Sequence, residues 1–293
     1  MNNNTLVAGA GGQLGCELVR TADSSKQCIA LSRAELDIAD AKSVAEALDR
    51  LQPDQVINAA AYTAVDGAES DPEGAYRGNA SGPATLAAAC AERDIRLIHI
   101  STDFVFDGHA SEPYQPGAST NPLGEYGRSK LAGEVAVRET LPDALIIRTG
   151  WVYSSFGGNF VKTMLRLMAD RDELAVVADQ VGTPTWANGL AHACWAAVMR
   201  PTVSGIYHWS DAGVCSWYDF AVAINEEALA LQLLDKATSV LPIPASEYPT
   251  PAKRPAYSVL DKASCWRDLV LKGTHWRRQL RNMLADLKEM GDG

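Results

Sequence analysis

A glycine-rich turn near the start of the chain constrains the fold most strongly. Residues 5–8 have the apolar character of a short strand, residues 9–15 read Gly-Ala-Gly-Gly-Gln-Leu-Gly, and residues 16–20 have helical character. Glycine permits a tight turn and a close approach of a ligand to the backbone, and the start of a helix attracts a phosphate. A strand, a turn with glycines at 9, 12 and 15, and a helix therefore predict a dinucleotide-binding unit.

The first half of the chain continues this alternation of strands and helices. Apolar strand-like runs at 28–31, 55–59, 96–101 and 144–148 alternate with helical patterns at 41–51, 82–93 and 126–140. Continuously apolar strands between amphipathic helices indicate a parallel sheet that is covered on both faces. The sequence therefore predicts the α/β class, with a Rossmann-type, doubly wound parallel sheet.

The pattern loosens beyond residue 155. We expect helices at 157–169, 187–199 and 216–231 and strands at 174–177 and 205–209. Five prolines between residues 242 and 255 exclude a long helix there and indicate a fixed loop near a site. We predict a dinucleotide-binding domain at 1–155, rejoined by about 180–210, and a smaller C-terminal substrate-binding part at 156–179 and 211–293.

Composition excludes several classes of protein. A 293-residue chain with 47% hydrophobic and 21% charged residues can bury a large core, and its net charge of −10 argues against nucleic-acid binding. No apolar run approaches the roughly 18 residues of a membrane span, and the polar start at 1–4 leads into a strand, so we expect a cytoplasmic protein without a signal peptide. Six scattered cysteines without a Cys-x-x-Cys pair suggest no metal site. The basic stretch at 275–281 is interpreted as the solvated face of a helix.

Tyr126 and Lys130 lie four residues apart in a predicted helix, after a Ser101-Thr102 pair that closes a strand. This spacing stacks the phenol and the ammonium on one face, where the cation would lower the pKa of the phenol toward neutrality. Such a phenol is a proton donor for a carbonyl oxygen. Two solvated side chains on a helix would give the same pattern, so the spacing needs its context.

The glycine spacing together with Tyr-x-x-x-Lys resembles the extended branch of the short-chain dehydrogenase/reductase superfamily, which acts on nucleotide-sugars. Segments 58–66, 101–106, 148–153, 179–185 and 248–255 narrow the match and, in family order, resemble the dTDP-4-dehydrorhamnose reductase family. The resemblance runs from about residue 5 to about residue 260. It implies reduction of the 4-keto group of dTDP-4-dehydro-L-rhamnose by hydride transfer from NADPH.

The cofactor preference depends on Arg33, which stands where an enzyme that binds the free ribose 2′-hydroxyl of NAD would carry an acidic residue. A guanidinium pairs instead with a 2′-phosphate, so NADPH is favoured and NADH is kept as an alternative. A simply solvated Arg33 is the competing interpretation. The resemblance and the predicted strand ends together give the cofactor-binding residues as Gly9, Gly12, Gln13, Leu14, Gly15, Ser32, Arg33, Asp37, Ile38, Ala60, Ala61, Tyr62, Thr63, Tyr126 and Lys130.

The resemblance also implies the catalytic roles. Tyr126 would donate the proton, Lys130 would lower the pKa of Tyr126 and hold the nicotinamide ribose, and Thr102 would hydrogen-bond the carbonyl oxygen. For Trp151 a core position, and for Arg254 a surface position, remain alternatives. Gly67 stands where the family often has a lysine, which puts one charge contact to the substrate in doubt. The predicted substrate-binding residues are Thr63, Val65, Asp66, Thr102, Asp103, Trp151 and Arg254.

Other functions share parts of this pattern. Nucleotide-sugar dehydratases follow the catalytic Thr with Asp-Glu, whereas Phe104 stands here in place of that glutamate, so elimination lacks its general acid/base. An epimerase, another nucleotide-sugar 4-ketoreductase and a non-catalytic NADP-binding regulatory subunit remain alternatives, since their core residues can be identical. Some relatives carry Mg²⁺ at a dimer contact; a homodimer is compatible with the resemblance, but no carboxylate cluster in this sequence can be assigned to Mg²⁺.

Overall fold

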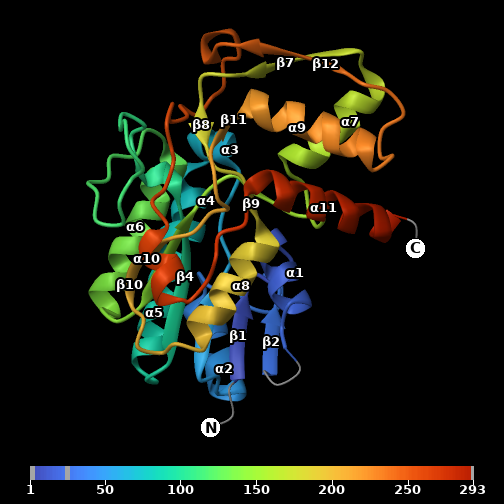
Figure 1. Cartoon of the computed structure of the whole chain (residues 1–293). Helices are drawn as coiled ribbons and strands as arrows, with labels where there is room; N and C mark the ends of the chain where they lie inside the picture. The colour runs from blue at the N-terminus through green and yellow to red at the C-terminus, as the bar shows by residue number, and fades with distance from the viewer. Residues whose placement is uncertain (1–3, 24–26, 292–293) are drawn as a thin grey trace.

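The computed structural model describes residues 4–23 and 27–291. Its central feature is a sheet of six parallel strands in the order β10-β5-β4-β3-β1-β2 (Figure 1). The order reverses between β1 and β3, which is where open α/β sheets form a ligand-binding crevice. The predicted α/β class and Rossmann-type sheet are confirmed. The strands are β1 (Asn4–Ala8), β2 (Gln27–Leu31), β3 (Gln55–Asn58), β4 (Arg96–Thr102), β5 (Leu145–Thr149) and β10 (Gly205–His208).

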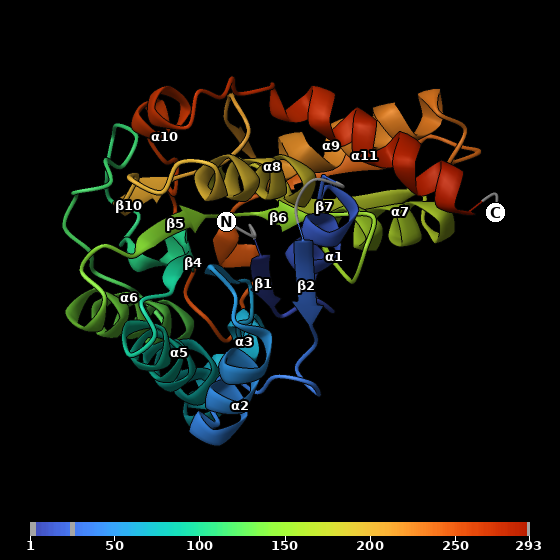
Figure 2. The same ribbon diagram turned by 90° about the horizontal axis from the view of Figure 1, so that it is seen from below.

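Helices cover both faces of this sheet (Figure 2). Leu6 and Ala8 of β1 pack into one core and Val7 packs into the other, because successive side chains of a strand point to opposite faces. The first core is closed by α2 (Ala41–Leu51), α5 (Gly82–Ala91) and α6 (Glu125–Thr140). The second is closed by α1 (Gln13–Arg20), α8 (Ala187–Val198) and α10 (Ala263–Asp268).

A smaller part with its own core lies beside the carboxyl ends of the strands (Figure 1). It contains a two-stranded parallel sheet of β7 (Glu173–Val177) and β12 (Ser239–Ile243), next to three helices. The helix α9 starts at a capping box, in which the Ser216 hydroxyl and the Asp219 carboxylate satisfy each other's backbone N–H groups. The three helices are α7 (Phe160–Asp170), α9 (Trp217–Ala230) and α11 (Trp276–Gly291).

Short elements connect the two parts. β6 (Val152–Tyr153) pairs with β9 (Thr185–Trp186), and β8 (Val181–Gly182) pairs with β11 (Cys215–Ser216). The remaining elements are α3 (Val65–Ser70), α4 (Pro72–Tyr76), the π-helical segment η1 (Arg77–Ser81) and the 3₁₀ turns η2 (Asp103–Val105) and η3 (Ala245–Glu247).

The predicted boundaries of the strands agree with those of the six sheet strands to within about two residues. The helix predicted at 41–51 is α2, which has the same first and last residues. Residues 244–255 form a loop apart from the short turn η3, as predicted for the proline-rich segment, whereas its first two residues, 242 and 243, end the strand β12. Pro242 is compatible with this strand since β12 has only one neighbour, so a missing N–H donor leaves no ladder partner unsatisfied on its outer side. Neither α3 nor α4 was predicted.

The predicted division into domains stays a prediction, but the placement of two segments bears on it. β10 pairs with β5 in the large sheet, and α10 packs there through Cys265 although it belongs to the predicted substrate-binding stretch. All six cysteines are free. Among the described residues, no helix is long and apolar enough to cross a membrane. Residues 1–3 of the polar start lie outside the described residues.

Candidate active site

A cavity of about 360 Å³ lies beyond the carboxyl ends of β1, β2 and β3. The structure brings together there eight of the predicted cofactor residues, which are Gly9, Gly12, Arg33, Asp37, Ile38, Ala60, Ala61 and Tyr62. Gly11, also in the lining, belongs to the predicted turn at 9–15, and the other lining residues, which are not among the predicted cofactor contacts, are Leu36, Ala39, Ala59, Asp71, Gly74, Arg77 and Gly78.

The glycine-rich turn has the shape that a phosphate group requires. Gly9 has a left-handed φ of +88°, and a Cβ atom there would lie 2.6 Å from the backbone nitrogen of Ala60. Nothing lies within 4 Å of the position that a Cβ atom of Gly11 would take, so the turn faces open space. No side chain caps the start of α1, and its first turn has no acidic residue. These residues therefore fit an anionic pyrophosphate.

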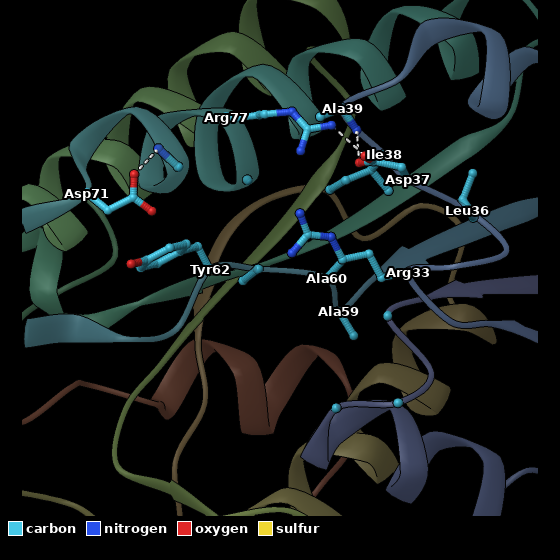
Figure 3. A pocket seen from close by; sticks show the side chains of 16 residues that line it. Arg33, Leu36, Asp37, Ile38, Ala39, Ala59, Ala60, Tyr62, Asp71 and Arg77 are labelled. Carbon is cyan, nitrogen blue, oxygen red and sulfur yellow. Dashed lines mark hydrogen bonds and ion pairs between the residues drawn. The ribbon is translucent and has the colours of Figure 1, made fainter. Parts of the chain in front are cut away.

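Two guanidinium groups share this cavity. Figure 3 shows the side chains of Arg33 and Arg77 reaching toward the same space, with Asp37 beside Arg77. An Arg77 nitrogen lies 2.5 Å from an Asp37 oxygen, and the N–H of Ala39 donates to the other Asp37 oxygen at 3.0 Å. Partial burial raises the pKa of Asp37, but these hydrogen bonds and the nearby positive charges outweigh burial and lower it. Asp71 also lines the cavity, so two guanidinium groups and two carboxylates share it.

Other predicted cofactor residues lie outside the cavity lining. The backbone N–H and hydroxyl of Ser32 donate to the Glu35 carboxylate at 2.8 and 2.7 Å. The side chain of Gln13 accepts a hydrogen bond from Asn159, whose own side chain caps the N-terminus of α7. Leu14 packs in the core, and Thr63 is exposed. A Cβ atom at Gly15 would lie 2.2 Å from the carbonyl oxygen of Gly9, so Gly15 serves close packing under the turn.

The predicted catalytic residues come from α6 and the end of β4. Tyr126 and Lys130 stand one turn apart on α6, and Thr102 is the last residue of β4 and hydrogen-bonds Tyr126. The Thr102 hydroxyl also accepts from the N–H of Phe104 at 3.2 Å, which fixes the start of η2. The ring of Phe104 packs edge-on against Tyr126 with 5.6 Å between centroids.

The electrostatics of this group differ from the prediction. Burial raises the pKa of Tyr126 to about 12; the hydrogen bond to Thr102 lowers it, and the charge of Asp103 raises it. The Nζ atom of Lys130 donates to the carbonyl oxygen of Ile100 at 2.7 Å. Burial lowers the pKa of Lys130 to about 8, against the opposing charge of Glu134. The predicted shift of the phenol toward neutrality is wrong in this structure, because desolvation dominates and the ammonium binds a backbone carbonyl.

Two predicted substrate residues bind each other. Arg254 forms a two-pronged ion pair with Asp66, at 3.1 and 2.8 Å, and Asp66 also accepts from the N–H of Ala252 at 3.1 Å. The pair fixes the proline-rich segment against α3 and lowers the pKa of Asp66, chiefly through the hydrogen bond from Arg254. Val65 is half-buried at the first position of α3.

Asp103 is buried behind Thr102. Burial raises the pKa of Asp103 to about 6, while hydrogen bonds to Ser258 and Thr102 lower it. A Cβ atom at Gly150 would lie 2.4 Å from a carboxylate oxygen of Asp103. The carboxylate therefore packs tightly against the end of β5, and Asp103 is placed to orient Thr102.

A second cavity, of about 620 Å³, lies in the smaller part. Trp217 lines it and stacks on Trp151, with 3.5 Å between ring centroids and an angle of 2° between planes. Trp151 has a left-handed φ of +51°, a strained conformation for a bulky residue that is typical of functional sites. The cavity is lined by Phe160, Thr163, Met164, Leu167, Arg171, Glu173, Leu174, Ala175, Val176, Val177, Gln180, Trp217, Ile243, Glu247, Tyr248, Thr250 and Arg254.

Of these lining residues, the sequence indicated only Arg254 as a contact. Trp217 was missed because the tryptophan follows a helix start and has no local pattern that distinguishes a stacked ring from a core one. Within the described ranges, no group of three or more His, Cys, Asp and Glu residues is arranged to hold a metal ion.

Comparison with known proteins gives matches over nearly the whole chain. The model of the RmlD substrate binding domain family matches residues 3–289. The dTDP-4-dehydrorhamnose reductase of Aggregatibacter actinomycetemcomitans is 41% identical over 287 residues, which cover 96% of this chain and 98% of the relative. A crystal structure of dTDP-4-dehydrorhamnose reductase from Bacillus anthracis in complex with NADP has a TM-score of 0.92 at 34% identity, covering 98% of this chain and all of that one. A reductase structure from Clostridium acetobutylicum has a TM-score of 0.91 at 39% identity and covers 97% and 99%.

Proposed function

The chain belongs to the dTDP-4-dehydrorhamnose reductase (RmlD) family, and on that premise we propose that Tyr126, Thr102 and Lys130 carry out the reaction of that family. The protein is an NAD(P)H-dependent oxidoreductase of dTDP-rhamnose and polysaccharide synthesis. It reduces the 4-keto group of dTDP-4-dehydro-L-rhamnose to give dTDP-L-rhamnose. The observation that carries the catalytic assignment is geometric: Tyr126 and Lys130 stand one turn apart on α6, and the ring of Phe104, two residues after Thr102, packs edge-on against Tyr126 with 5.6 Å between centroids.

Tyr126 donates the proton. Negative charge develops on the carbonyl oxygen during reduction, and the oxygen needs a donor that still carries its proton at neutral pH. The phenol of Tyr126 meets that need, because burial raises its pKa to about 12. In this structure the Thr102 hydroxyl donates its proton to the Asp103 carboxylate at 3.1 Å. When the substrate binds, this hydroxyl would turn to donate to the carbonyl oxygen instead.

The chain's residues fit NADP(H), which a relative's structure contains. When bound, NADPH supplies the hydride that is added to the carbonyl carbon. The glycine turn and the uncapped start of α1 would hold the pyrophosphate, and Arg33 would pair with the 2′-phosphate. Lys130 would hold the nicotinamide ribose through its ammonium, which Glu134 helps to keep charged despite burial.

The nucleotide-sugar would lie between the catalytic group and the second cavity. Trp151 and Trp217 offer a stacked aromatic platform, and Arg254 offers a guanidinium that its ion pair with Asp66 holds in place. Thr63 and Val65 complete the proposed sugar contacts. We further propose the division into a cofactor-binding domain at 1–155 and about 180–210 and a substrate-binding part elsewhere, a cytoplasmic location and a homodimer.

The decisive experiment is a spectrophotometric assay of NADPH oxidation with dTDP-4-dehydro-L-rhamnose. We expect consumption of NADPH and formation of dTDP-L-rhamnose, with a smaller rate with NADH at equal concentration. Release of water from dTDP-glucose would identify a dehydratase, and interconversion of a UDP-sugar without net cofactor use would identify an epimerase. Tight binding of NADPH with no turnover of any 4-keto sugar would identify a regulatory subunit.

A further inference from the structure

Arg77 enters the cofactor cavity, by which we mean the cavity of about 360 Å³ at the ends of β1, β2 and β3, from a different wall than Arg33. Arg77 belongs to η1, whereas Arg33 lies in the turn after β2. Figure 3 shows both guanidinium groups directed into the space between these two segments. Asp37 is the carboxylate that they share: Arg77 forms an ion pair with it at 2.5 Å, and the charge of Arg33 also acts on it.

The two partners of this ion pair are held to different degrees. The Asp37 carboxylate accepts a hydrogen bond from the N–H of Ala39 at 3.0 Å. The next residue, Ile38, packs against the start of α5, where a Cβ atom at Gly82 would lie 2.8 Å from the Ile38 side chain. The side chain of Arg77, by contrast, is 52% exposed. An ion pair at such a position contributes little to stability, so its guanidinium can exchange Asp37 for a stronger partner at small cost.

The charges at this end of the cavity favour an anion. Asp71, the other carboxylate of the lining, accepts from the N–H of Gly74 at the start of α4, and Figure 3 shows it well apart from the two guanidinium groups. Of the lining residues at this end, Arg33 and Arg77 therefore have only Asp37 opposite them, which leaves one positive charge unbalanced. A phosphate monoester carries up to about two negative charges at neutral pH and has three strong acceptor oxygens, so it fits there better than a second carboxylate.

We propose that Arg77 is a second binding residue for the 2′-phosphate of NADPH, which it binds together with Arg33 after leaving Asp37. The proposal rests on the proposed function insofar as it takes Arg33 as the first partner of that phosphate. A guanidinium presents its N–H donors in a planar fork, so two of them can bind the phosphate oxygens from opposite walls of the cavity. NADH has a hydroxyl group at this position, and Arg77 then stays with Asp37. Arg77 thereby raises the preference of the enzyme for NADPH.

Arg93 offers a matched control. Its guanidinium also forms an ion pair with an aspartate of another element, Asp49 of α2, at 2.8 Å. Neither Arg93 nor Asp49 lines the cofactor cavity or the second cavity. Arg93→Ala therefore removes the same kind of side chain and the same kind of ion pair, and it should leave the Kd values for NADPH and NADH unchanged.

The experiment measures the Kd values for NADPH and NADH, which differ only in the 2′-phosphate, by fluorescence titration of the full-length protein without sugar. Arg77→Ala should weaken the binding of NADPH about 10-fold, the scale of a hydrogen bond to a charged group, and change that of NADH less than about 2-fold. Arg77→Lys keeps the charge but not the planar fork, so it should restore part of the affinity for NADPH. In the double variant Arg33→Ala/Arg77→Ala, the Kd for NADPH should approach that for NADH.

Two results with Arg77→Ala would overturn the proposal. Equal weakening of NADPH and NADH would mean that Arg77 contacts a part that both cofactors share, and unchanged Kd values would mean that it serves only its ion pair with Asp37. Where Arg77→Ala does not fold, Arg77→Gln, which keeps most of the side chain, decides by the same two Kd values. If the unsubstituted protein prefers NADPH but does not reduce the sugar, the proposed function fails instead, and the Kd values still test the role of Arg77.

Discussion

The two cavities of this protein are built in different ways. All residues that line the cofactor cavity lie between positions 9 and 78, at the ends of three neighbouring strands, in the turns after them, and in and just before α4 and η1. The second cavity is lined by residues between 160 and 254, and one wall is the pairing of β7 with β12, in which Glu173 faces Ser239. The shape of the cofactor cavity thus depends mainly on the turns that follow neighbouring strands. The shape of the second cavity depends on contacts between residues that are far apart in the sequence.

The largest effect is expected for Tyr126, the proposed proton donor, which would act between the cofactor cavity and the second cavity. Tyr126→Phe should keep NADPH binding and lower kcat by about 100-fold or more, since the phenyl ring packs alike but supplies no proton. The measurement is steady-state kinetics together with NADPH titration. Tyr153→Phe is the control, because among the described residues the buried hydroxyl of Tyr153 has no hydrogen-bond partner. Near-normal turnover of Tyr126→Phe would contradict the assignment.

The next prediction concerns the cofactor cavity alone. Arg33→Ala should raise the KM for NADPH by about 10-fold and the KM for NADH far less, because only NADPH has a 2′-phosphate for the guanidinium to bind. The measurement is KM for both cofactors at saturating sugar. Arg138, an exposed residue of α6, provides the control Arg138→Ala. Equal effects on both cofactors would mean that the Arg33 guanidinium does not bind the 2′-phosphate.

The corresponding prediction for the second cavity uses the stacked tryptophans. Trp217→Ala should raise the KM for the nucleotide-sugar several-fold and leave the Kd for NADPH unchanged, since Trp217 lines only the second cavity. Trp217→Phe keeps an aromatic ring and should restore most of the affinity. An unchanged KM in Trp217→Ala would place the substrate outside this cavity, and a weaker Kd for NADPH would show that the two regions are not separate.

The smallest expected effect is a change in stability on substitution of Asp211, a buried residue shortly after β10. Its carboxylate accepts hydrogen bonds from the N–H of Trp186 and from the side chain of Gln279. Burial raises the folded-state pKa of Asp211 to about 8, far above its ordinary value, so the folded protein binds a proton that the unfolded chain releases. Stability from this group is therefore lost as pH rises from about 4 to about 8. Asp211→Asn should raise Tm by about 3 °C at pH 8, and less at pH 5. A gain that is independent of pH would show that Asp211 does not titrate in this range.

The comparison also explains what the sequence could predict. The six-stranded sheet and eight lining residues of the cofactor cavity follow from local patterns, because the end of a strand and the turn after it are adjacent in sequence. The ion pair of Arg77 with Asp37 spans 40 positions, and that of Arg254 with Asp66 spans 188. No periodicity encodes such contacts, so the sequence indicated neither ion pair and overlooked Arg77.

The pKa of Tyr126 was mispredicted for a related reason. Spacing on a helix places Lys130 one turn from the phenol, but it does not indicate where the ammonium points or how much water the pair loses. In the structure the ammonium of Lys130 donates to the carbonyl oxygen of Ile100. Ile100 belongs to β4, and the packing of α6 on the sheet, which the sequence does not show, brings the two groups together. Desolvation then outweighs the charge of the neighbouring lysine.

Because β10 forms one edge of the sheet, the sheet can be completed only late in the synthesis of the chain. β10 covers the open side of β5, yet its first residue, Gly205, follows the end of β5 by more than 50 positions. While the ribosome is still making α7, β7 and α8, the backbone of β5 has an unpaired edge, which in other proteins invites aggregation. The nascent chain can therefore form the cofactor cavity early, but it closes its sheet only after α8 has emerged.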